Sequence, residues 1–118
     1  MTIDLRENRI FSYDSNRRLK EHKAFSTVFS HFKVLPNGKV LIIENYYKYQ
    51  NGKNSNLYCI NQDIEIEWFA QANSDEDGLD LYVGFTKNGS NIYANTWNCF
   101  RVEIDVLSGK IISREFTK

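Results

Sequence analysis

Short runs in which apolar and polar residues alternate, separated by turn residues, are the feature that most constrains the fold of this chain. The run from Ile64 to Trp68 reads Ile-Glu-Ile-Glu-Trp, and the run from Phe100 to Asp105 alternates in the same way. A period of two places successive side chains on opposite faces, so each run predicts a half-buried β-strand. The residues expected to be buried are Ile64, Ile66, Trp68, Val102 and Ile104.

Turn signals separate the candidate strands. Pro36-Asn37-Gly38 lies between two apolar runs. Asn88-Gly89 follows a third alternating run, whose apolar members are Leu79, Leu81, Val83 and Phe85. Asn-Gly favours a tight turn because asparagine tolerates positive φ and glycine adopts it at little cost. Both signals predict antiparallel hairpins.

These pieces recur along the chain. A pattern of four strands and their turns covers residues 30–70 and again 80–116, and half of it covers 9–23. The spacing of about 45 residues is the length of a four-stranded propeller blade. We therefore expect one all-β domain over residues 1–118, with about ten strands in antiparallel four-stranded sheets that form an open partial β-propeller. A short helix within residues 17–32 is the alternative.

Composition limits the compartment and the partners. The 118 residues suit one domain with its own core. Residues 1–9 are too charged for a secretory signal and no apolar run is long enough to span a membrane, so a cytoplasmic location is expected. Formal net charge is zero, which argues against a general nucleic-acid binder. Cys59 and Cys99 are expected to be buried thiols rather than a bridge.

The residue types that carry catalysis do not occur in a recognisable pattern. His22 and His31 have no cysteine or acid at a metal-ligand spacing, so surface or core histidines are expected. A triad of Cys59, His31 and an acid has no supporting motif. We expect no enzyme activity, no metal and no cofactor, with a small hydrolase that uses Asp75 and Asp77 as the weakest alternative.

A partial calcium-loop pattern is the nearest approach to a metal motif. Asn73, Asp75, Asp77 and Gly78 occupy its positions one, three, five and six. Position twelve is Gly84 instead of the glutamate that would bind the ion through both oxygens. A solvated acidic loop is therefore the better interpretation.

Acidic residues concentrate in one segment. Between Lys53 and Lys87 there is no basic residue and there are seven acids. This segment is either the solvated face of the sheet or a negative patch that attracts a basic protein. The acids expected to contact such a partner are Glu65, Glu67, Asp75, Glu76, Asp77 and Asp80.

Aromatic residues form two clusters, one at residues 46–49 and one at 93–100. Tyrosine and tryptophan on the exposed face of a sheet are common anchors of protein interfaces. Tyr47, Tyr49 and Trp97 are therefore the candidate anchors.

The strings LYCINQDIEIEWF and IYANTWNCFRVEIDVLSGKII resemble propeller-blade repeats, over about residues 9–116. The chain also resembles immunity proteins of bacterial toxin and immunity pairs, such as contact-dependent growth inhibition systems. That resemblance implies a protein that binds a cognate toxin, often a basic nuclease domain, and blocks it in the cytoplasm. The alternative function is a β-scaffold that associates with itself through open sheet edges.

Overall fold

The described part of the chain contains β-strands and no helix. The computed structural model describes residues 2–4, 8–13, 19–75, 78–86 and 91–117. The predicted all-β class is confirmed, and the short helix considered within 17–32 is wrong, because the described residues there form two strands. Thirteen strands are described instead of about ten, because residues 2–4 and 73–75 had no clear sequence pattern and the alternating run that begins at Leu79 is divided between two strands.

The strands form three main sheets and a small hairpin, all antiparallel. The N-terminal sheet contains β1 (Thr2–Asp4), β2 (Arg9–Tyr13) and β3 (Leu19–Lys23). The middle sheet contains β4 (Phe29–Val34), β5 (Val40–Glu44), β6 (Leu57–Ile60) and β7 (Ile66–Phe69). The C-terminal sheet contains β10 (Tyr82–Thr86), β11 (Ile92–Thr96), β12 (Phe100–Ile104) and β13 (Ile111–Phe116). The hairpin consists of β8 (Asn73–Asp75) and β9 (Gly78–Asp80).

Each four-stranded sheet has its strands in sequence order, so neighbouring strands are consecutive in the chain. The predicted turn at Pro36-Asn37-Gly38 is confirmed: Gly38 has a φ of 85°, and its N–H donates to the Leu35 carbonyl at 2.9 Å. The predicted Asn88-Gly89 turn lies outside the described residues.

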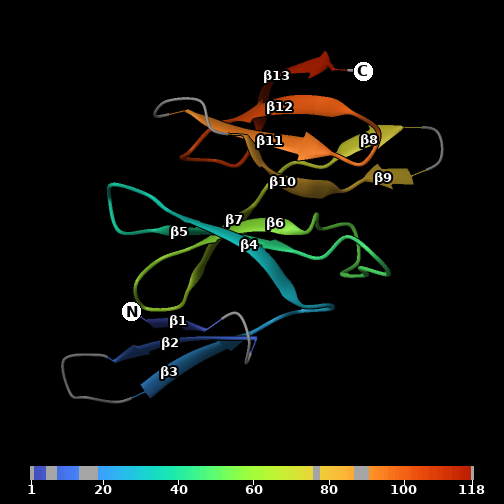
Figure 1. Ribbon diagram of the computed structural model, residues 1–118. Coiled ribbons are helices and arrows are strands. Elements are labelled where there is room, and N and C mark those ends of the chain that lie inside the picture. Colours follow the sequence, from blue (N-terminus) through green and yellow to red (C-terminus); the bar gives the residue numbers. More distant parts are fainter. Residues whose placement is uncertain (1, 5–7, 14–18, 76–77, 87–90, 118) are drawn as a thin grey trace.

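The middle sheet is buried on both faces, which explains why β5 is apolar at four successive positions. Figure 1 shows this sheet between the other two. Leu41 and Ile43 pack toward the C-terminal sheet, whereas Val40 and Ile42 pack toward the N-terminal sheet. An uninterrupted apolar run is the usual pattern of a strand covered on both sides.

The expected burial is confirmed for Val102 and Ile104 but wrong for Ile66, which is 37% exposed. Ile64 and Trp68 are half-buried and pack against opposite faces of the middle sheet. The cause is the turn before β7, where Ile64 has a φ of 62°, together with a register shift between Cys59 and Ile60. These two irregularities interrupt the alternation that the sequence pattern implies.

The two cysteines have different environments. Cys59 is buried in β6, as expected, and burial raises the pKa of its thiol to about 11. Cys99 is exposed in the turn between β11 and β12, where its φ is 70°, so its expected burial is wrong. Both are free thiols.

The C-terminal sheet is polar on its outer side. Its inner side chains include Ala94 and Val102, so their neighbours along the strands face outward. Three polar pairs cross the strands on that outer face: Arg101 with Glu115, Ser113 with Glu103, and Thr86 with Asn95. This face resembles the polar cap that ends a stack of repeats.

Candidate functional site

The two predicted aromatic clusters meet at one end of the middle and C-terminal sheets. They line a hollow of about 460 Å³, which we call the aromatic cleft. One wall comes from the loop between β5 and β6, and the other comes from the residues before β10 and the turn after β11. The lining residues are Tyr46, Tyr47, Lys48, Asp80, Leu81, Trp97 and Asn98.

Local hydrogen bonds shape the first wall. The Asn45 N–H donates to the Val28 carbonyl at 2.8 Å, and the Asn45 side-chain oxygen accepts the Tyr47 N–H at 2.8 Å. An asparagine that closes a turn in this way reverses the chain directly after β5. The turn leaves Tyr47 68% exposed and the neighbouring Tyr46 half-buried.

The second wall is tied to the chain that precedes β10. The Trp97 N–H donates to the Leu81 carbonyl at 2.9 Å, and the Asn98 N–H donates to Asp80 Oδ1 at 2.9 Å. Trp97 is 61% exposed, and its ring centroid lies 4.8 Å from that of Tyr46. The structure thus brings the predicted anchors Tyr47 and Trp97 into one cleft.

Asn56 fixes the two walls relative to each other. Its side chain is fully buried and donates to the Glu44 carbonyl at 2.6 Å and to the Tyr82 carbonyl at 2.7 Å. Its oxygen accepts the Tyr82 N–H at 2.9 Å. One amide therefore joins the end of β5 to the start of β10, so the cleft is held by buried hydrogen bonds.

Asp80 lies at the floor of the cleft and is only 3% exposed. The alternation of Leu79, Leu81, Val83 and Phe85 predicted one strand, and that prediction is wrong. The chain leaves the small hairpin at Asp80 and enters the C-terminal sheet at Tyr82, so no single strand runs through this segment. Asp80 Oδ2 accepts Asn73 Nδ2 at 2.8 Å, and Asn73 in turn accepts Arg114 Nη1 at 2.6 Å.

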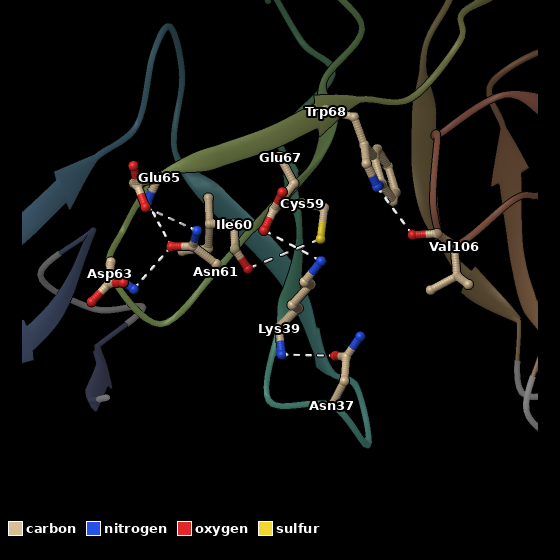
Figure 2. A network of polar contacts seen from close by, with 10 residues as sticks. All are labelled: Asn37, Lys39, Cys59, Ile60, Asn61, Asp63, Glu65, Glu67, Trp68 and Val106. Atoms are coloured by element: carbon tan, nitrogen blue, oxygen red, sulfur yellow. Dashed lines mark hydrogen bonds and ion pairs between the residues drawn. The ribbon is translucent and has the colours of Figure 1, made fainter.

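Two of the other predicted acids lie far from the cleft along the strands. Glu67 pairs with Lys39 at 3.3 Å, and Glu65 accepts Asn61 Nδ2 at 3.2 Å (Figure 2). Lys39 precedes β5 and the cleft loop follows it, so these acids belong to the opposite end of the middle sheet. Glu65 and Glu67 therefore do not lie around the aromatic residues, whereas Asp80 does.

The remaining predicted contact residues are divided among several environments. The backbone of Asp75 ends β8, whereas Glu76 and Asp77 lie outside the described residues. Tyr49 is buried, and its hydroxyl donates to the Ser55 carbonyl at 3.0 Å. Tyr49 thus supports the loop instead of lining the cleft, and Tyr46 takes the place that the sequence pattern gave to Tyr49.

A buried polar network on the other side of the middle sheet had no sequence signal. Glu44 is fully buried, and its two oxygens accept the consecutive N–H groups of Phe25, Ser26 and Thr27 at 2.8–3.2 Å. The Tyr58 hydroxyl donates a fourth bond at 2.6 Å. Successive N–H groups form a nest for an anion, so Glu44 closes the connection between β3 and β4.

His22 completes this network. Its Nε2 lies 2.7 Å from the Tyr58 hydroxyl oxygen. The Tyr58 proton already goes to Glu44, so Nε2 carries the proton of a neutral imidazole and donates it. Burial lowers the pKa of His22, and the nearby Glu44 opposes that shift in part. His22 is a satisfied core histidine, while His31 is exposed on β4, so both agree with the expectation for the two histidines.

The described residues contain no group of three or more His, Cys, Asp or Glu side chains arranged to hold a metal ion. They also contain no helix that could cross a membrane.

Stacked antiparallel sheets define the class: an all-β protein, here with an aromatic cleft on its surface. The chain belongs to the family described as Domain of unknown function (DUF7957), which matches residues 31–116. That span contains every residue that lines the aromatic cleft. No curated protein and no solved structure matches the chain.

Proposed function

We propose that this chain is a non-catalytic protein that binds another protein through the aromatic cleft. The observation that carries the proposal is the pairing of two exposed large rings, Tyr47 and Trp97, on walls fixed by buried hydrogen bonds. Tyrosine and tryptophan in a well-supported hollow dominate binding energy at protein interfaces. A rigid site also loses little conformational entropy when its partner binds.

Charge favours a protein over a nucleic acid as the partner. The chain has no net charge, and Lys48 is the single cation among the described residues that line the cleft. Proteins that hold single-stranded nucleic acid combine stacking rings with a basic groove that follows the backbone. Here the rings are accompanied by a buried carboxylate, which would repel phosphate.

We infer that the stacked sheets form an open segment of a β-propeller. Two features support this: both larger sheets are four-stranded meanders, and β10 lies beside β4 and β5 of the preceding sheet. The polar outer face of the C-terminal sheet disfavours further stacking of copies. That face therefore favours a different protein over a second copy stacked on it.

The partner that fits the resemblance is a cognate bacterial toxin domain with a basic surface, such as a nuclease, bound in the cytoplasm. In this proposal the cleft supplies the buried contacts of the complex. Charged residues at the rim would mainly change the association rate.

The proposal requires a gene for a larger secreted toxin directly upstream of the gene for this chain, and the test uses the toxin domain that such a gene encodes. Cells that produce this domain should grow only when the chain is produced with it, and the purified proteins should associate. Combining Tyr47→Ala with Trp97→Ala should weaken binding about thirtyfold or more and abolish protection. Leu107→Ala, at a site that is 79% exposed and outside the cleft, is the matched control. Undiminished binding by the double variant, or no binding by the unchanged chain, would overturn the proposal.

A further inference from the structure

We infer that the aromatic cleft receives an arginine side chain of the partner, with the guanidinium on the aromatic rings and beside the Asp80 carboxylate. This inference rests on the proposed function, because it names the group that a protein partner would place in the cleft. Three observations carry it: the ring faces, the internal cation over Tyr47 and the buried carboxylate at the floor.

The cleft already holds a cation against one of its rings. Lys48 Nζ lies 5.6 Å from the centroid of the Tyr47 ring, within the distance at which an ammonium group interacts with an aromatic face. The Tyr46 and Trp97 rings lie against each other, with centroids 4.8 Å apart and planes tilted by 31°, and Trp97 remains 61% exposed. Tryptophan gives the strongest interaction of this kind, and Trp97 has no such cation among the described residues.

The floor of the cleft supplies negative charge. Asp80 accepts hydrogen bonds from two neutral donors, Asn73 Nδ2 and the Asn98 N–H, and it forms no ion pair within the described residues. Arg114 is connected to it only through Asn73. A carboxylate that is 3% exposed favours a cation brought to the cleft, because water screens a buried charge less than a surface charge.

Arginine fits this combination better than lysine. A guanidinium is planar, so it can stack on a ring while its edge donates hydrogen bonds to a carboxylate. It is also more weakly hydrated than an ammonium group, which lowers the cost of entering a hollow lined by three aromatic side chains. Lys48 would compete with the arginine for the ring faces, and its positive charge would repel the guanidinium.

The probe is a capped tripeptide, glycine-arginine-glycine, compared with the same peptide containing citrulline, which has nearly the same shape but no charge. The two tryptophans give two indole N–H signals in an NMR spectrum of the ¹⁵N-labelled chain. The Trp68 indole donates to the Val106 carbonyl at 3.1 Å, away from the cleft, and serves as the internal control (Figure 2). The arginine peptide should shift the Trp97 signal saturably and leave the Trp68 signal in place. The citrulline peptide should bind about tenfold more weakly or worse.

Two variants should change the affinity for the arginine peptide in opposite directions. Lys48→Met removes the competing cation, so it should tighten binding of the arginine peptide severalfold. Asp80→Asn removes the charge of the floor and should weaken it about tenfold. Equal affinities for the two peptides, or an unchanged affinity in folded Lys48→Met, would overturn the inference. Toxin binding that persists with such a result would leave the proposed function standing, whereas peptide binding without toxin binding would remove the proposed function alone.

Discussion

The two faces of the middle sheet are built from the same strands but hold their neighbours in different ways. Toward the C-terminal sheet, β5 and β6 present only buried apolar side chains, among them Leu41, Ile43 and Leu57. Toward the N-terminal sheet, Ile42 and Ile60 are joined by Tyr58, whose hydroxyl belongs to the Glu44 network. We call these the apolar joint and the polar joint.

The difference concerns what each joint depends on. Apolar burial is roughly proportional to area and has no strict directional requirement. A buried carboxylate with four donors requires each partner in place, because an unsatisfied charge or donor in the interior is costly. The apolar joint should therefore lose stability when volume is removed, and the polar joint when a single proton or charge is changed.

The largest expected effect is a cavity in the apolar joint. Ile104 on β12 is 2% exposed, so Ile104→Ala should lower the free energy of unfolding by about 2–5 kcal/mol through lost burial and an unfilled cavity. Urea unfolding followed by circular dichroism measures the change. Ile66→Ala is the matched control, because Ile66 is 37% exposed on β7 and should cost clearly less. Equal losses for both variants would contradict the placement of the joint.

The polar joint can be broken without changing its volume. Glu44→Gln keeps one acceptor oxygen but directs an amide donor toward backbone N–H groups and the Tyr58 hydroxyl. Hydrogen bonds to a charged group contribute about 1.5–3 kcal/mol each, so a loss of about 2–3 kcal/mol is expected. Glu115→Gln, which removes an exposed ion pair with Arg101, should cost less than about 1 kcal/mol. Similar losses for both would show that burial of Glu44 adds nothing.

The apolar joint was largely predictable from sequence, whereas the polar joint was not. Alternation placed Val102 and Ile104 correctly because β12 is a regular strand with one buried face. Glu44 ends the apolar run of β5, and no local pattern reveals that its carboxylate faces a connection about 18 residues earlier in the chain. Such a contact depends on how two sheets stack, which single-strand patterns do not encode.

The candidate site was predictable only in its aromatic half. The sequence pattern predicted Tyr47 and Trp97 on the exposed face of a strand; both are exposed, but they lie in the loop after β5 and the turn after β11. The burial of Asp80 was not predicted because the chain changes sheets at Leu81, and Tyr49 was misplaced because the loop after β5 folds it inward. Both errors have one physical cause: side chains in connections are oriented by tertiary hydrogen bonds and not by a period of two.

A smaller effect on stability is expected at the contact between Gly109 and Trp68, a ring that packs against the apolar joint. Gly109 has a φ of 75°, and a methyl group there would lie 2.4 Å from the Trp68 ring. Gly109→Ala should therefore cost about 1–3 kcal/mol, from backbone strain plus displacement of a ring. Gly52→Ala is the control, since its φ is 60° with no atom within 4 Å of the added carbon. Thermal unfolding should show a larger loss for Gly109→Ala, and equal losses would mean that the ring moves freely.

The smallest expected effect is a dependence of stability on pH, which should come from the polar joint and not from the apolar joint. Burial lowers the pKa of His22 below its ordinary value of 6.5, so between the folded and unfolded pKa values the unfolded chain binds more protons than the folded chain. Stability from this group is then fully present above pH 6.5 and is lost as the pH falls through the folded pKa. One proton gives a slope of at most about 1.4 kcal/mol per pH unit.

His22→Gln tests this dependence, because glutamine can still donate to the Tyr58 hydroxyl oxygen but does not titrate. The free energy of unfolding of both proteins is measured with urea between pH 7.5 and 5.5. The unchanged chain should lose stability faster than the variant as the pH falls, because only the unchanged chain has an imidazole that binds a proton less readily when folded. Ile104→Ala, which affects only the apolar joint, should keep the pH slope of the unchanged chain. Parallel curves for the unchanged chain and His22→Gln would show that the imidazole titrates alike in the folded and unfolded states. The two joints would then differ in hydrogen bonding but not in their response to pH.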